Sequence, residues 1–210
     1  MPASRDWWTG VLFAVGSALF AVGAAPGYAG AVGARWDSVT FFVGSLFFTS
    51  AAYLSFLGAG GDRRSLGWWA AAVQLAGTLY FNVSTGTATS ANLAAETANQ
   101  HVWRPDAIGS ACFLVASGLA WYQVCGGWTA WRPRSRSWGT ALANLLGSVA
   151  FGVSAVAGYI SPATGAVRNA ERANLGTFVG AVCFFIGALL TLPAAPSRAG
   201  RSRGSRARRG

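Results

Sequence analysis

The sequence contains no lysine, one histidine and few charged residues of either sign. Charged side chains make up 10% of its 210 residues, whereas an average soluble domain has roughly 25%. A soluble domain needs charged groups over its whole surface, so this composition argues against that class. Disorder is equally unexpected, because 53% of the residues are hydrophobic and 13% are aromatic. The composition indicates a membrane protein.

Metal ligands and reactive side chains are also scarce. The three cysteines, Cys112, Cys125 and Cys183, stand in or at the end of apolar runs, and no C-x-x-C pair occurs. His101 is the only histidine. A zinc or iron–sulfur site needs several such ligands, so we expect neither a metal nor another cofactor. A buried cysteine then acts as a small apolar side chain.

The basic residues are sixteen arginines, six of them in the last thirteen residues. GC-rich codon usage is the simplest explanation for arginine without lysine. Residues 194–210 are rich in Gly, Ser and Arg, so we predict a disordered tail. Its arginines favour anionic lipid head groups at the inner leaflet. Nucleic acid would use the same charges, but no aromatic residue able to stack on bases follows Phe185.

Six apolar stretches are long enough to cross a bilayer, which takes about 20 residues. They are approximately residues 8–25, 38–57, 67–84, 106–125, 138–160 and 174–192. Pro193 follows the last stretch, where a helix readily stops. We therefore predict an all-α membrane protein, with a six-helix transmembrane bundle in residues 1–193.

The first stretch also has features of a cleaved signal peptide, namely Arg5, an apolar run and small residues near Ala25. Two features favour a retained span instead. Asp6 weakens the basic end, and the stretch carries a repeat that all the other stretches share. We interpret it as the first transmembrane helix.

The distribution of arginine predicts the orientation. Six spans place the N-terminus, the second and fourth loops and the C-terminus on one side, and that side carries twelve of the sixteen arginines. The other side carries Arg35, Arg104, Arg168 and Arg172. Because cytoplasmic segments are enriched in arginine, we predict a multi-pass protein of the plasma membrane with both termini in the cytoplasm. Tryptophans near the span ends are typical of the membrane interface.

Each predicted span contains one copy of a five-residue unit, in which Gly is followed by a small residue, two variable residues and Phe. The copies are Gly16-Ser17-Ala18-Leu19-Phe20, Gly44-Ser45-Leu46-Phe47-Phe48, Gly77-Thr78-Leu79-Tyr80-Phe81, Gly109-Ser110-Ala111-Cys112-Phe113, Gly147-Ser148-Val149-Ala150-Phe151 and Gly180-Ala181-Val182-Cys183-Phe184. Composition alone would give roughly one or two such matches. One copy in every span suggests duplication, consistent with three repeated helical hairpins.

The unit has the properties of a helix-packing motif. Gly and Phe stand four residues apart and therefore share one helical face. Gly lets a neighbouring backbone approach closely, which is how membrane helices gain van der Waals contact, and Phe fills the adjoining groove. The hydroxyls bond within or between helices in this interpretation. In the alternative, they line a conduit for a solute.

The first two copies carry a resemblance to a known family. Val15-Gly16-Ser17-Ala18-Leu19-Phe20, then Trp36, then Val43-Gly44-Ser45-Leu46-Phe47-Phe48 resemble the YrhK-like domain, a two-helix membrane hairpin of unknown function. This resemblance covers roughly residues 7–58. The whole chain, with Trp103-Arg104-Pro105-Asp106 and Trp131-Arg132-Pro133-Arg134, is similar to uncharacterised polytopic membrane proteins of actinobacteria. Neither resemblance implies a catalytic residue.

No charged residue lies inside a predicted span, and Asp106 at the start of the fourth is interpreted as a helix cap. Charges inside the membrane mark ion pathways and proton relays, so their absence argues against such functions. The neutral residues Gln74, Gln123 and Asn144 remain. We interpret them as hydrogen-bonding contacts between helices, with substrate contact as the alternative.

The third loop, residues 85–105, contains the one candidate ligand site. Its polar residues Asn92, Glu96, Asn99 and Gln100 recur at helical spacing, which predicts a short helix on the membrane surface. Glu96 and His101 are the only acid–base candidates there, and no nucleophile accompanies them. A solvated loop helix is the simpler interpretation, and a ligand site at Glu96 and His101 is the alternative.

Two functions follow from these features. The first is a non-enzymatic structural or interaction component of the bacterial inner membrane, held together by the packing motif, in contact with lipid and able to pair with itself or another membrane protein. The second is a small transporter or channel for a neutral solute, with the hydroxyls of Ser17, Ser45, Thr78, Ser110 and Ser148 along its path.

Overall fold

The computed structural model describes residues 4–90, 92–129 and 131–192, and the predicted tail lies outside this range. The described residues form helices and a single isolated β-bridge between Ile160 and Val167. The helices are α1 (Arg5–Gly23), α2 (Tyr28–Val32), α3 (Ala34–Gly58), α4 (Leu66–Ala88), α5 (Ala95–Ala98), η1 (Asn99–Trp103), α6 (Arg104–Cys125), α7 (Arg136–Ala157) and α8 (Ala170–Thr191). The predicted all-α class is confirmed for this part of the chain.

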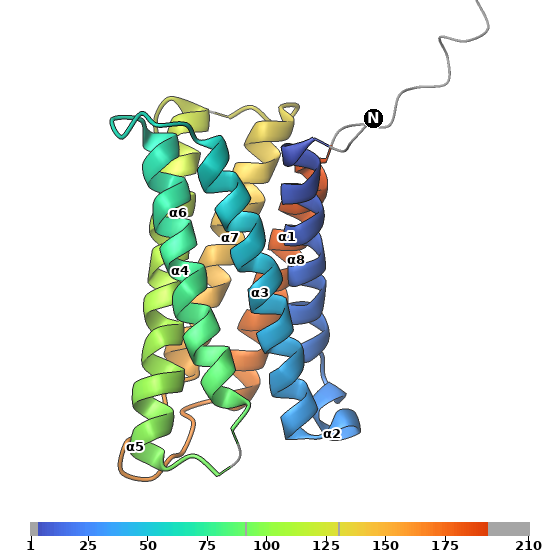
Figure 1. Ribbon diagram of the computed structural model, residues 1–210, viewed down its shortest axis with the longest axis vertical. Helices are drawn as coiled ribbons and strands as arrows, with labels where there is room; N and C mark the ends of the chain where they lie inside the picture. The colour runs from blue at the N-terminus through green and yellow to red at the C-terminus, as the bar shows by residue number, and fades with distance from the viewer. Residues whose placement is uncertain (1–3, 91, 130, 193–210) are drawn as a thin grey trace, which may run out of the picture.

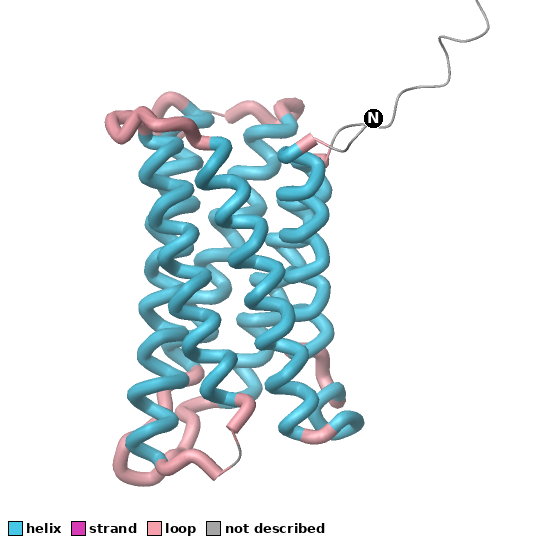
Figure 2. The backbone as a smooth tube through the Cα atoms, in the orientation of Figure 1, coloured by secondary structure: helices cyan, strands magenta, loops and turns pink. Residues whose placement is uncertain are grey.

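The long helices α1, α3, α4, α6, α7 and α8 stand side by side and alternate in direction (Figures 1 and 2). Each contacts the next in chain order, and α8 closes the ring against α1. The contacts are most extensive within the pairs α1–α3, α4–α6 and α7–α8. The structure is therefore a closed ring of three antiparallel hairpins. We call the end that holds the start of α1 and the end of α8 the termini end.

Five helical segments are long and apolar enough to cross a membrane: α1, α3, α7, α8 and residues 95–125, which include α6. The predicted count of six spans is not confirmed, because α4 does not meet this standard. Its 23 residues suffice in length, but Gln74 and Asn82 lower its mean hydropathy. The structure thus shows five candidate spans and a further helix of comparable length, α4, in the same ring.

Two predictions about the third loop are wrong. Residues 95–103 do not form a separate surface helix, because α5 and η1 continue directly into α6 as one helix of 31 residues. Asp106 does not cap a helix, since it lies eleven residues inside this continuous helix and no side chain caps α6. A further correction concerns the span predicted to reach Ile160, because α7 ends at Ala157 and the next residues form a turn.

The first helix of each hairpin begins in the same way. Ser4, Ser65 and Ser135 each accept a hydrogen bond from the backbone N–H three residues later, where a tryptophan stands each time. A serine at this position satisfies an N–H group that the helix itself leaves unpaired. The motif glycine follows twelve residues after each serine. The repeat is therefore longer than the five-residue unit and includes the helix start.

Within each hairpin, the two helices exchange glycine and phenylalanine. A Cβ atom built on Gly16 would lie 2.8 Å from the ring of Phe48, and one built on Gly44 would lie 2.8 Å from the ring of Phe20. The other two hairpins show the same exchange, with Gly77 against Phe113, Gly109 against Phe81, Gly147 against Phe184 and Gly180 against Phe151. Each ring thus occupies the space that a missing side chain leaves on the facing helix.

The six motif phenylalanines meet at the centre of the ring in two layers. Phe20, Phe81 and Phe151 form one triangle, with ring centroids 5.9 to 6.2 Å apart. Phe48, Phe113 and Phe184 form the other, at 5.6 to 6.2 Å. Pairs within each hairpin join the layers at 5.0 to 5.6 Å. Aromatic rings at such separations attract one another, so the axis is filled by a continuous aromatic cluster, which we call the Phe layers.

Candidate functional site

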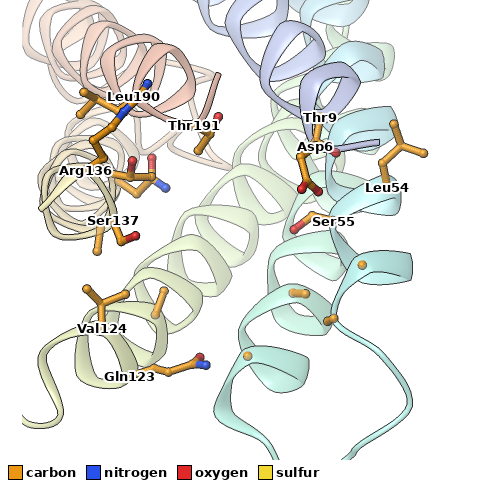
Figure 3. A pocket seen from close by; sticks show the side chains of 18 of the residues that line it. Asp6, Thr9, Leu54, Ser55, Gln123, Val124, Arg136, Ser137, Leu190 and Thr191 are labelled. Carbon is orange, nitrogen blue, oxygen red and sulfur yellow. The ribbon is translucent and has the colours of Figure 1, made fainter. Parts of the chain in front are cut away.

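A wide cavity, which we call the vestibule, enters the bundle at the termini end (Figure 3). Its volume is about 970 Å³, and all six long helices contribute to its lining. Apolar residues such as Leu54, Val124 and Leu190 alternate there with polar ones. The polar lining consists of Asp6, Thr9, Ser55, Asp62, Ser65, Gln123, Arg136, Ser137, Thr140, Asn144 and Thr191.

The vestibule narrows toward the bundle centre. A second cavity of about 150 Å³ shares Thr9, Ser55, Asn144 and Thr191 with it and also contacts Gln74. Phe184 of the Phe layers is part of the same lining. The linings of the two adjoining cavities therefore range from charged groups at the rim, through the amides of Asn144 and Gln74, to Phe184.

The two amides occupy equivalent places in the repeat. Gln74 and Asn144 each precede a motif glycine by three residues, and Phe13 stands at the corresponding place in α1. All three line the inner cavity. Gly187 makes room for one of them, since a Cβ atom there would lie 2.5 Å from Asn144 Oδ1. The cavity thus lies on the axis of the threefold repeat, with amides on two sides and a ring on the third.

The three charged groups at the rim differ in their hydrogen bonding. Arg136 donates a hydrogen bond to the carbonyl oxygen of Leu192 at 2.6 Å, and Asp62 accepts one from the backbone N–H of Arg64 at 3.0 Å. Within the described residues, the Asp6 carboxylate takes part in no hydrogen bond or ion pair. Asp6 and Ser55 both line the vestibule and are labelled in Figure 3. A carboxylate in this setting favours a hydrogen-bond donor or a cation.

The motif hydroxyls do not reach the vestibule. Ser17, Ser45, Thr78 and Ser148 are fully buried, and Ser110 is nearly so. Ser45 bonds Thr85 on α4 at 3.0 Å, and Ser148 donates to the carbonyl oxygen of Phe113 on α6 at 3.1 Å. These bonds join neighbouring hairpins. Ser45 and Ser148 of the predicted conduit therefore bond across two different helix interfaces, and within the described residues none of the five hydroxyls lines the vestibule.

The predicted ligand pair lies at the opposite end of the bundle. Glu96 and His101 are both exposed, and Glu96 accepts a hydrogen bond from Gln100. Within the described residues no contact joins Glu96 to His101, and neither lines any of the cavities described above. A ligand site at these two residues stays a prediction.

Asn99 is buried and connects two segments, although the residues around it in the sequence are polar. It is 2% exposed, donates to the carbonyl oxygen of Ile160 at 2.5 Å and accepts from Arg104 Nε at 3.2 Å. It therefore ties η1 to the α7–α8 loop. The helical spacing that grouped it with Glu96 and Gln100 gave no sign that one face of this segment is covered by a distant loop.

The vestibule itself was not predicted as a site. Asp6, Asp62 and Gln123 stand far apart in the sequence, and none belongs to a motif. The order of the spans could have indicated it. Residues at the starts of the odd spans and at the ends of the even spans must lie at the same end of the bundle. Within the described residues, no group of three or more His, Cys, Asp or Glu side chains is placed to hold a metal ion.

No family model, curated protein or solved structure matches this chain. The resemblance to the YrhK-like domain therefore stays a prediction. What the fold defines is a class: an all-helical protein with several helices that suit a membrane.

Proposed function

We propose that this chain is a six-span protein of the bacterial inner membrane that acts, without enzymatic activity, as a structural or interaction component. The observation that carries this proposal is the pair of Phe layers. The space left between them is about 10 Å³, close to the minimum that holds one water molecule. A bundle filled in this way is a rigid scaffold with a polar face at one end.

The outer surface supports a membrane location. Large apolar side chains cover it, and Val153, Val156 and Leu175 remain about 60% exposed. Such a surface would associate in water, whereas lipid covers it. Helix α4 stands between α3 and α6 in the ring, and its Gln74 lines the inner cavity. A polar residue that faces the interior does not prevent α4 from crossing with its neighbours.

The two ends support the orientation. The described part of the termini end carries Arg5, Arg63, Arg64, Arg132, Arg134 and Arg136, against Arg35, Arg104, Arg168 and Arg172 at the opposite end. Exposed tryptophans such as Trp8, Trp69 and Trp131 stand near the termini end, and Trp36 near the opposite end. This arrangement fits cytoplasmic termini and two interfacial belts. The vestibule then faces the cytoplasm, where a partner with a donor or cationic group meets Asp6.

A solute transporter is the second candidate, and the vestibule is the observation that favours it. Its inner amides provide both donors and acceptors for a neutral polar solute. Transport along the axis would require the Phe layers to separate, since the motif hydroxyls provide no alternative path. The packed aromatic cluster makes the scaffold role the better-supported proposal.

Flux through reconstituted protein distinguishes the two. Proteoliposomes mixed against a glycerol gradient should shrink and recover at the rate of empty liposomes, followed by light scattering. A variant with Phe48→Ala and Phe184→Ala serves as the positive control, because it opens one Phe layer. Wild-type flux well above that of empty liposomes would favour the transporter and contradict the scaffold proposal.

A further inference from the structure

A groove runs along the outside of the bundle near the end opposite the termini, with a volume of about 500 Å³. One stripe of α7 forms its wall, because Val149, Gly152, Val153 and Val156 follow the spacing that places residues on one helical face. Leu114 of α6 forms the other side. These valines and Leu114 are between 41% and 61% exposed. The volume lies in the range of specific ligand sites.

Gly152 keeps this groove open. A Cβ atom built there would meet no other atom within 4 Å, so no packing contact explains a glycine inside a helix, where it costs about 1 kcal/mol relative to alanine. The repeat sharpens this point. The equivalent positions, five residues after the motif glycine, hold Ala21 in α1 and Asn82 in α4. Of these three equivalent positions, only the one in the third hairpin is a glycine.

Two arginines stand at the polar end of the groove. Arg168 and Arg172 are exposed and belong to its lining, together with Asn169, which caps α8. Within the described residues neither guanidinium takes part in a hydrogen bond or ion pair. The neighbouring Glu171 is exposed and is not part of the lining. Counted back from the motif glycines, the places equivalent to Arg168 and Arg172 hold Val32 of α2 and Trp36 of α3 in the first hairpin. In the second hairpin they hold Thr97 of α5 and His101 of η1.

We propose that this groove binds one anionic phospholipid, with an acyl chain along the valine stripe of α7 and the head-group phosphate at Arg168 and Arg172. Charge complementarity carries the choice of occupant, because a guanidinium pair matches the geometry of a phosphate. The start of α8 adds N–H groups and a positive dipole end beside the same arginines. The inference rests on the proposed membrane location but not on the orientation or on a scaffold role.

Native mass spectrometry of the full chain in detergent tests this binding. The protein is titrated with dioleoylphosphatidylglycerol and, separately, with dioleoylphosphatidylcholine. Wild type should bind one molecule of dioleoylphosphatidylglycerol at least tenfold more tightly than it binds dioleoylphosphatidylcholine. The double variant Arg168→Gln, Arg172→Gln should weaken that binding about 25-fold, from roughly fivefold per arginine. Gly152→Leu should weaken the binding of both lipids, because its side chain occupies the space of the acyl chain.

Matched controls separate the groove from general effects. Gly118→Leu also adds a side chain at an open helical glycine, outside the groove, and Arg63→Gln, Arg64→Gln removes the same charge at the termini end. Both should bind like wild type. Excess inorganic phosphate should not displace the lipid, since the acyl chain contributes to its binding.

The proposal is overturned if the arginine variant keeps wild-type affinity, if Gly152→Leu elutes as a folded protein and binds normally, or if free phosphate displaces the lipid completely. Should Gly152→Leu fail to fold, the exposed arginine pair still decides. Extraction from the membrane fraction is checked beforehand. A protein that needs detergent but binds both lipids equally contradicts the groove alone, whereas one that remains soluble without detergent contradicts the membrane proposal.

Discussion

The two ends of the bundle differ, although both have hydrogen bonds between distant residues. At the termini end, Arg5 donates to the carbonyl oxygen of Leu57 and Arg136 to that of Leu192. At the termini end the helices separate around a cavity of about 970 Å³. At the other end, long-range hydrogen bonds tie the elements together. Ser84 donates to the carbonyl oxygen of Val102 at 2.8 Å, and Trp103 Nε1 donates to that of Ala155 at 2.9 Å. Trp103 also stacks edge-on against Tyr159 at 4.8 Å.

This difference shows that the repeat builds the middle of the molecule and the loops decide its ends. The Gly–Phe exchange is the same in all three hairpins, so it cannot favour one end over the other. The third loop adds α5, η1 and Asn99 at the end opposite the termini, and these cover it. Within residues 4–90, 92–129 and 131–192, no comparable insertion stands at the termini end, where the vestibule opens.

The largest effect is expected from variants that disrupt the shared middle. Gly44→Leu combined with Gly147→Leu places side chains where a Cβ atom would already lie 2.8 Å from the Phe20 ring and 2.9 Å from the Phe184 ring. Overpacking costs about 1–3 kcal/mol per site, and sites in different hairpins should roughly add. We expect a loss of about 2–6 kcal/mol in unfolding free energy, measured by denaturation in mixed micelles. Gly118→Leu is the control, and equal stability of the two would contradict the packing account.

The second largest effect should be confined to the end opposite the termini. Asn99→Ala removes two hydrogen bonds and leaves the carbonyl oxygen of the partly buried Ile160 without its donor, at a cost of about 1–3 kcal/mol. Hydrogen exchange should rise in η1 and in the α7–α8 loop but not around the vestibule. Gln100→Ala, at an exposed neighbouring position, should change neither. Exchange that rises equally at both ends would mean that the ends are not independent.

A smaller contrast lies within the repeat itself. Ser148 donates toward the carbonyl oxygens of Phe113 and Asn144 at 3.1 and 2.9 Å. The equivalent Ser17 Oγ is buried and has no hydrogen-bond partner among the residues that the structure describes. Ser148→Ala should cost about 0.6 kcal/mol, the average for such bonds between membrane helices. Ser17→Ala should be neutral or slightly stabilising, because it removes an unsatisfied group. Paired unfolding curves measure the difference, and the opposite order would refute it.

The smallest effect on stability is expected at the termini end. Asp6→Asn alters a rim group that has no partner within the described residues, so the unfolding free energy should change by less than about 0.5 kcal/mol. A large loss would show that the vestibule is a structural element and not a free surface. The same unfolding assay serves, with Asp62→Asn as the companion variant at the rim.

The sequence predicted the parts of this fold that repeat. The five-residue unit located a helix at every copy, because Gly and Phe four residues apart have a fixed meaning on a helix face. It missed the capping Ser4, Ser65 and Ser135, which belong to the same repeat but lie outside the apolar windows. The third loop was misread because the amphipathic pattern does not report that η1 continues into α6.

The candidate site was harder to predict for a physical reason. Gln74 and Asn144 were recognised as polar residues inside apolar stretches, yet their common cavity depends on the ring closing through α8 and α1. Asp6 and Gln123 are far apart in the sequence, and only the folded chain brings both to the lining of the vestibule. The groove at Gly152 exists because a side chain is missing. The sequence indicates it only through the difference between Gly152 and the equivalent residues of the other hairpins.

Cysteine accessibility tests the central claim most directly, namely that the vestibule opens at the termini end and the Phe layers seal it from the other. In a background with Cys112, Cys125 and Cys183 replaced by alanine, single variants Ser55→Cys and Ser45→Cys are treated with a membrane-impermeant maleimide in right-side-out and inverted vesicles, with Ser4→Cys as the reference for the N-terminus. We predict that Ser55→Cys reacts only from the side on which Ser4→Cys reacts, and that Ser45→Cys reacts from neither. Labelling of Ser55→Cys from the opposite side, or of Ser45→Cys from water, would contradict the account.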